Sequence, residues 1–261
     1  MILLSFRKNF DNRLEFAAVP QWRIPPGETT AGRRCLFMIH GYENSAGAAE
    51  GNYANIERNL RDCGLFDPDL EAGKRFNQLV GVLWPGQTAL GFWLAERAAD
   101  RAAILLRQAI ESMPPAESIS IVTHSLGARV ALAGFLPSVS GRLYFRRFQE
   151  TVLLAPAVDD NCLDRGGRYA LAALFSQRTL VCYSRRDEVL GIWFRRFSAF
   201  LNFNDVALGY NGPRNPSKVG PGVAAFDGTP YVDSHGGWMS CKQMYALWAC
   251  AVWPSCSSPA R

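Results

Sequence analysis

The sequence lacks long hydrophobic runs and several short motifs that define well-known protein classes. No stretch approaches the roughly 18 consecutive apolar residues that a membrane-spanning helix needs, so we expect no transmembrane segment. A GxxxxGKS/T loop, an HExxH pair and a CxxC pair are all missing, which argues against a P-loop nucleotide hydrolase and against zinc catalysis. The apolar start MILLSF is followed by no small-residue cleavage site, and we therefore expect no signal peptide.

Histidine is scarce and cysteine has no regular pattern. The chain has three histidines, and its seven cysteines form an odd set. Several cysteines lie inside apolar runs such as CLFMIH and TLVCYS, where cysteine acts as a small hydrophobic residue. This pattern predicts buried free thiols in a reducing, cytoplasmic environment.

Positive charge is in slight excess but is not concentrated. The net charge is +5, and the arginines are scattered along the chain, so we expect no nucleic-acid partner. The pair Arg195 and Arg196 lies within the aromatic segment LGIWFRRFSAFLNF, residues 190–203, which fits either a lid or lipid-facing helix or a buried core helix. Peripheral membrane contact therefore stays open, and the sequence indicates no oligomeric state.

Short apolar runs alternate with longer helical segments, which is typical of parallel strands joined by helical crossovers. We therefore predict a single α/β domain of 261 residues, with a mostly parallel central sheet flanked by helices. Residues 1–34 are expected to extend the sheet at an edge, and residues 188–222 to contain a lid or cap segment. The predicted strands cover 35–39, 79–84, 118–123, 151–155, 179–183 and 223–226, and the predicted helices cover 46–62, 90–113, 126–136 and 239–252.

A strand, a tight turn and a helix are predicted to meet at Ser125. The run SISIVTH leads directly into SLGARVALAGFL, so the serine hydroxyl is expected to project beyond the sheet. Gly127 and Ala128 are small residues after the serine, whereas Thr123 places a β-branched side chain two residues before it, where a small residue is usual. Ser125 is therefore a candidate nucleophile, and the alternative is an ordinary helix N-cap.

The first internal apolar run, CLFMI, ends in His40-Gly41-Tyr42. A turn at the carboxyl end of a strand beside a nucleophile presents backbone N–H groups to the negative charge of a tetrahedral intermediate. The predicted donors of this oxyanion hole are the backbone amides of Tyr42 and Leu126. An ordinary strand-end turn at Gly41 is the alternative.

A serine nucleophile needs a base within hydrogen-bond reach, and the chain offers few. His40 and His124 flank other motif positions, which leaves His235, in the segment YVDSHGG, as the predicted general base. A lone histidine is more often structural, so this assignment depends on its combination with the other motifs.

The acid that orients the base must lie on a rigid loop at the same edge of the sheet. Asp187, in YSRRDEV, follows a predicted strand and is the preferred candidate. Asp159 and Asp160, in LLAPAVDD, follow the preceding strand and are rivals. Asp187 as a plain helix N-cap is the further alternative.

Taken together, the segments IHGYENS, LWPG, VTHSLGARVAL, LLAPAVD, YSRRDEVL and DSHGGW resemble the α/β-hydrolase superfamily over residues 35–240 and are similar to a group of bacterial hydrolase-like proteins. The resemblance implies a catalytic triad of Ser125, Asp187 and His235 in that chain order, with neither a cofactor nor a metal. With these three residues, we expect a serine hydrolase of esterase or lipase type that acts on a small-molecule acyl substrate. The identity of that substrate does not follow, because the fold hosts many activities.

Four residues near these motifs are candidates for lining the substrate pocket: His40, Gly41, Trp84 and His124. Trp84, in LWPG, ends a predicted strand, and a packing role is its alternative. The competing function is a hydrolase-fold protein that has lost activity and serves in binding. The presence of nucleophile, acid and base in order favours the enzyme.

Overall fold

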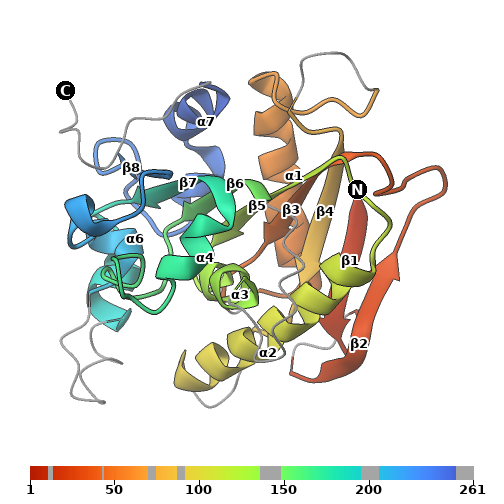
Figure 1. Cartoon of the computed structure of the whole chain (residues 1–261), viewed down its shortest axis with the longest axis horizontal. Coiled ribbons are helices and arrows are strands. Elements are labelled where there is room, and N and C mark those ends of the chain that lie inside the picture. The colour runs from red at the N-terminus through yellow and green to blue at the C-terminus, as the bar shows by residue number, and fades with distance from the viewer. Residues whose placement is uncertain are drawn as a thin grey trace.

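A computed structural model describes residues 1–10, 14–42, 44–69, 75–86, 92–135, 148–194 and 206–250. At its centre is an eight-stranded sheet in the order β2-β1-β4-β3-β5-β6-β7-β8 (Figure 1). Neighbouring strands run parallel except β1 and β2, which pair antiparallel. The predicted α/β fold with a mostly parallel sheet is therefore confirmed. The strands are β1 (Ile2–Arg7), β2 (Phe16–Arg23), β3 (Arg34–Ile39), β4 (Gln78–Leu83), β5 (Ser118–His124), β6 (Phe148–Leu154), β7 (Ser176–Tyr183) and β8 (Val223–Asp227).

Helices cover both faces of the sheet. α1 (Ala46–Asp62) and α7 (Lys242–Ala249) lie on one face, and α2 (Phe92–Ser112) and α3 (Gly127–Gly134) lie on the other (Figure 1). These four helices fall within the predicted helical segments. The short helices α4 (Ala170–Leu174) and α6 (Leu208–Asn211) have no counterpart in the sequence prediction.

The packing between α1 and the sheet shows why these residues form these elements. α1 begins after Ser45, whose Oγ accepts a hydrogen bond from the Ala48 N–H at 3.0 Å. A Cβ at Gly81 of β4 would lie 2.7 Å from the ring of Tyr53 on α1, so the glycine permits close contact between helix and strand. The buried residues of α1 recur at helical spacing: Ala46, Ala49, Tyr53, Ile56 and Leu60.

The N-terminal segment adds two strands, of which only β2 lies at the edge of the sheet. β1 lies between β2 and β4 and pairs parallel with β4. All six of its residues are buried. Its direction brings Arg7, the last residue of β1, to the carboxyl edge of the sheet, where β3, β4, β5, β6 and β7 also end.

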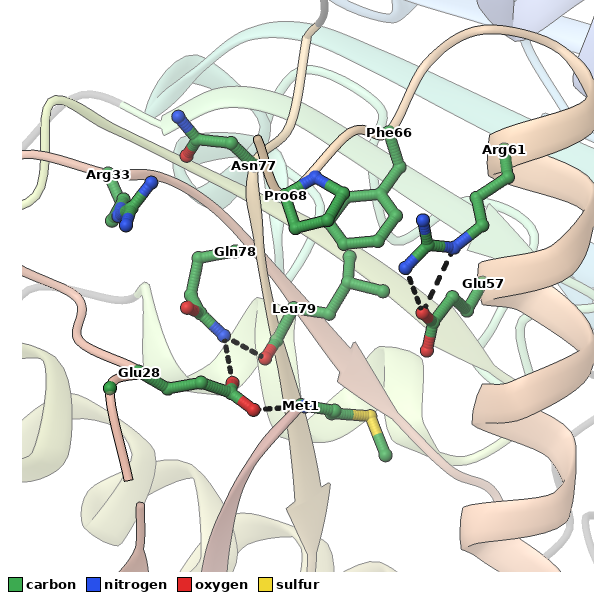
Figure 2. Close-up of a pocket in the computed structure, with 11 residues that line it drawn as sticks. Met1, Glu28, Arg33, Glu57, Arg61, Phe66, Pro68, Asn77, Gln78 and Leu79 are labelled. Carbon is green, nitrogen blue, oxygen red and sulfur yellow. Dashed lines mark hydrogen bonds and ion pairs between the residues drawn. The ribbon is translucent and has the colours of Figure 1, made fainter. Parts of the chain in front are cut away.

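The opposite, amino edge of the sheet carries a pocket of about 270 Å³ next to the first residues of β1, β3 and β4. Figure 2 shows some of its polar side chains in pairs: Gln78 donates to Glu28 at 2.7 Å, and Arg61 donates to Glu57 at 2.7 Å. The carboxyl ends of the strands, where parallel sheets bind their ligands, lie at the other edge.

The buried carboxylate of Glu150, at the amino edge of the sheet, binds α7 to the sheet through side-chain contacts. Glu150 of β6 is 1% exposed and forms ion pairs with Arg178 and, at 3.2 Å, with Arg75. It also accepts a hydrogen bond from the Trp248 indole at 2.7 Å. Arg75 donates in turn to the backbone carbonyls of Trp248 and, at 2.8 Å, of Cys250 at the end of α7. One charged cluster thus joins β6, β7 and α7.

Residues 188–222, predicted to contain a lid or cap segment, are described in part. Asp187 is followed by a π-helix (Val189–Phe194), and α6 and a 3-10 helix (Pro216–Lys218) come later. Residues 195–203 of the aromatic segment lie outside the described residues, so the lid stays a prediction.

Six cysteines fall within the described ranges and form no disulfide there. Burial raises the pKa of the Cys35 thiol to about 12. Cys256 lies outside the described residues. None of the helices in the described ranges combines the length and apolar character needed to cross a membrane.

Candidate active site

Ser125 occupies a strained turn between β5 and α3. Its φ angle is +54°, in the left-handed region that non-glycine residues rarely adopt. The turn is held from both sides: the Ser125 N–H donates to the Leu154 carbonyl at 2.9 Å, and the Ser125 carbonyl accepts from the N–H groups of Ala128 and Ala157, each at 3.1 Å. Such strain persists only where surrounding contacts enforce it, and it is concentrated at functional sites.

Two glycines allow other loops to approach this turn. A Cβ at Gly127 would lie 2.6 Å from the carbonyl oxygens of Ile39 and His40, and a Cβ at Gly41 would lie 2.7 Å from the Ser125 Cβ. The loop after β3 therefore packs directly against the serine. Thr123 is buried in β5, and its hydroxyl has no hydrogen-bond partner among the described residues.

Asp187 and His235 form a hydrogen-bonded pair at the same edge. The Nδ1 atom of His235 lies 2.7 Å from Oδ2 of Asp187, which is fully buried. The other carboxylate oxygen of Asp187 accepts the Leu190 N–H at 3.0 Å, so the aspartate also caps the π-helix that follows. Because a carboxylate accepts at Nδ1, that nitrogen carries a hydrogen, and Nε2 of the neutral ring is left as an acceptor.

His124 links the serine turn to this pair. Its Nε2 atom lies 2.8 Å from the His235 carbonyl oxygen, and the two imidazole rings lie 4.7 Å apart between centroids. Burial, followed by the neighbouring His235, lowers the pKa of His124 to about 3, so His124 is neutral and donates through Nε2. Among the described contacts there is no hydrogen bond between Ser125 and His235.

The rival aspartates have other partners. Asp160 is 1% exposed and pairs with Arg214 at 2.7 Å. Asp159 pairs through its backbone with Ala207. In the described structure, Asp187 is the aspartate that contacts His235.

Of the two predicted oxyanion-hole residues, Tyr42 lies in the loop after β3 and Leu126 in the turn between β5 and α3. The Gly41 carbonyl accepts from His40 Nδ1 at 2.8 Å and from Asn44 Nδ2 at 3.4 Å. No described residue accepts a hydrogen bond from the Leu126 N–H, at the start of α3.

Two of the four residues predicted to line the pocket have buried side chains. Trp84 is fully buried and donates from its indole to the His40 carbonyl at 2.8 Å, and the His40 ring is 2% exposed and stacks on it. Both side chains face inward because they hold the loops after β3 and β4 together. Gly41 and His124 do lie next to Ser125 or its turn.

Sequence reasoning missed Arg7. Its guanidinium is fully buried and donates to the carbonyls of Trp84 at 3.2 Å and Asn44 at 2.8 Å. The available signal was an arginine at the end of the mostly apolar run ILLSFR.

Among the described residues, no group of three or more histidine, cysteine or acidic side chains is placed to hold a metal ion.

A serine on a strained turn after a central parallel strand, with an aspartate–histidine pair beside it, places this protein among the α/β hydrolases. Within that class, the chain belongs to the family described as alpha/beta hydrolase of unknown function (DUF900), whose profile matches residues 27–210. No curated protein sequence matches the chain.

Solved structures with a similar fold include esterases. The chain is 14% identical to the Pyrococcus furiosus esterase Pf2001, with TM-scores of 0.43 and 0.45 in two crystal forms, over 87% and 88% of this chain and 84% of that one. It is 17% identical to the metagenomic carboxyl esterase MGS0156, with a TM-score of 0.37, over 87% of this chain and 77% of that one. Likeness at this level carries no argument about the substrate.

Proposed function

We propose that the protein is a serine hydrolase that cleaves a carboxylic ester or a related acyl compound through an acyl-enzyme. The observation that carries the proposal is the strained Ser125 turn at the sheet edge where Asp187 holds Nδ1 of His235 at 2.7 Å. This combination prepares a hydroxyl, a neutral imidazole acceptor and a buried carboxylate for acyl transfer.

In the first half of the proposed reaction, His235 Nε2 takes the Ser125 hydroxyl proton as Oγ adds to the substrate carbonyl carbon. Asp187 stabilises the resulting imidazolium and keeps the ring in one tautomer. The backbone amides of Tyr42 and Leu126 are the proposed donors to the developing oxyanion. The tetrahedral intermediate then collapses, the ester C–O bond breaks, and the leaving alcohol takes the proton from His235.

In the second half, water gives a proton to His235 and adds its oxygen to the acyl carbon. The new intermediate expels the Ser125 oxygen, which recovers the proton from His235, and releases the carboxylic acid. This mechanism uses no cofactor. Gly41 is proposed to lie beside the acyl carbon, because it approaches Ser125 so closely that a Cβ at Gly41 would lie 2.7 Å from the Ser125 Cβ.

Hydrolysis of neutral p-nitrophenyl esters of graded acyl length tests the proposal. Ser125→Ala should lower kcat/KM by several orders of magnitude, whereas Ser112→Ala, on the exposed end of α2, should leave it unchanged. A Ser125→Ala protein that turns over esters like the wild type would mean that another residue is the nucleophile. A folded wild type that is inactive on every ester would support the binding-protein alternative.

A further inference from the structure

The contacts of His40 define its tautomer. Nδ1 lies 2.8 Å from the Gly41 carbonyl oxygen, which only accepts, so Nδ1 carries the hydrogen. Nε2 lies 3.2 Å from the Trp84 N–H and 3.3 Å from Arg7 Nη2, both of which only donate, so Nε2 accepts. Burial, and then the nearby Arg7 cation, lower the pKa of His40 to about 3, which keeps the ring neutral. One neutral tautomer therefore satisfies all three contacts.

The hydrogen bond to Gly41 determines which way the next amide points. In a trans peptide, the Gly41 carbonyl and the Tyr42 N–H lie in one plane and point in opposite directions, and the described chain contains no cis peptide. The hydrogen bond from His40 fixes the direction of the Gly41 carbonyl, and the Tyr42 N–H therefore points in the opposite direction. Gly41 itself approaches the Ser125 Cβ closely enough to exclude a side chain.

Arg7 donates hydrogen bonds to His40 and to the loops after β3 and β4. Its buried guanidinium bridges the ends of three strands: it starts from β1, donates to the Trp84 carbonyl after β4, and donates to the Asn44 carbonyl and His40 Nε2 after β3. Because one rigid, planar group makes all of these contacts, the loop after β3 is held in a single position relative to the sheet.

We propose that His40 and Arg7 are positioning residues that orient the Gly41–Tyr42 peptide and so aim the Tyr42 N–H at the oxyanion formed on Ser125. This inference rests on the proposed serine-hydrolase function. Neither side chain touches the substrate. They act through the backbone, so their effect belongs to the transition state rather than to substrate binding.

Two substitutions at His40 separate orientation from packing. Asparagine places its Nδ2 donor near the position of the histidine Nδ1, so His40→Asn keeps the hydrogen bond to Gly41. Glutamine places its amide near the position of Nε2, so His40→Gln keeps the contacts with Trp84 and Arg7 but loses the one to Gly41. We expect kcat to fall about 10²–10³-fold in His40→Gln, the loss typical of one oxyanion donor, and less than about tenfold in His40→Asn.

The readouts are kcat, KM and the affinity of a trifluoromethyl ketone, which forms a tetrahedral adduct with an active serine. In His40→Gln, the ketone should bind more weakly by about the same factor by which kcat falls, with KM within threefold of the wild type. A folded His40→Gln protein with wild-type kcat, or one in which KM rises while ketone affinity is unchanged, would overturn the inference.

Asn44→Ala covers the case in which His40→Gln does not fold. Asn44 is a half-buried loop residue that donates to the Gly41 carbonyl at 3.4 Å and to the Tyr42 carbonyl at 3.0 Å. Its removal should lower kcat and ketone affinity together by a smaller factor, and an unchanged kcat would count against the inference. Covalent modification of wild-type Ser125 by a fluorophosphonate, measured in parallel, tells failure of this inference from failure of the proposed function.

Discussion

The two edges of the central sheet both bury polar side chains, but they differ in backbone geometry. At the carboxyl edge, Ser125 and Ala155 adopt positive φ angles of 54° and 45°, and they are the only non-glycine residues in the described ranges to do so. At the amino edge, positive φ falls on Gly27 and Gly32, where it carries no steric cost.

The buried carboxylates at the two edges, Glu150 and Asp187, also differ in their partners. Glu150 at the amino edge is surrounded by two arginines and an indole that join three elements of the fold. Asp187 at the carboxyl edge contacts a histidine that is still 17% exposed. We therefore expect substitutions at the amino edge to lower stability and substitutions at the carboxyl edge to lower activity, and the two effects can be measured separately.

The largest effect is expected at the base. His235→Gln should lower kcat/KM for a neutral ester by about 10⁴–10⁶-fold, because it removes the proposed acceptor of the serine proton. It should also remove the acid limb of the pH–rate profile. His124→Gln is the matched control: with a pKa lowered to about 3, His124 stays neutral above pH 5, so its replacement should leave that limb in place. An unchanged limb in His235→Gln would locate the base elsewhere.

The second effect compares two buried aspartates at the carboxyl edge. Asp187→Asn should lower kcat/KM about 10³–10⁴-fold, because an amide no longer holds His235 in the productive tautomer. Asp160→Asn should keep activity within about tenfold, because Asp160 pairs with Arg214 and not with the histidine. Both rates are to be measured on one ester. A larger loss at Asp160 would contradict the assignment of the acid.

The third effect lies at the amino edge and should appear in stability. Glu150→Gln leaves Arg75 and Arg178 without their shared carboxylate, and because both arginines are partly exposed, we expect a loss of about 2–3 kcal/mol. Urea unfolding measures this loss. The kcat of the folded variant should equal that of the wild type, and a large fall in kcat would remove the distinction between the edges.

The smallest effect concerns pH and the buried His40. Its pKa is lowered to about 3 in the folded protein, against about 6.5 in an unfolded chain. Between these values the unfolded state binds the extra proton, so the stabilisation is present above about pH 6.5 and is lost as the pH falls towards 3. His40→Asn removes this linkage.

Both proteins should lose unfolding free energy between pH 7 and pH 5. The loss in the wild type should exceed the loss in His40→Asn by about 1–2 kcal/mol. Urea titrations of both proteins at the two pH values give the difference. Equal losses in the two proteins would mean that His40 is not held neutral by the fold.

Much of the fold followed from the sequence because the buried strands are nearly continuous apolar runs. β3, β5 and β7 fall within a few residues of the predicted segments, and the predicted strand–turn–helix arrangement around Ser125 is present. The order of strands in the sheet was not predictable, because β1 enters between β2 and β4 through contacts distant in sequence. The role of Arg7 depends on that insertion.

The acid illustrates the same limit. Asp160 and Asp187 each follow a strand that ends at the same edge, so sequence position alone left both open as partners of His235. Side-chain direction, set by the loops around them, separates the two. Trp84 was likewise placed at the correct strand end, but the sequence did not reveal that its indole faces inward towards the His40 carbonyl.

Reaction with a fluorophosphonate, followed by mass spectrometry of the modified peptide, tests most directly whether Ser125 is an activated nucleophile. We predict a single adduct on Ser125 in the wild type. Labelling should be lost in Ser125→Ala, strongly slowed in His235→Gln and Asp187→Asn, and unchanged in Glu150→Gln. Modification of a different residue, or labelling that persists at the wild-type rate in His235→Gln, would contradict the assignment of Ser125, Asp187 and His235 as a catalytic triad.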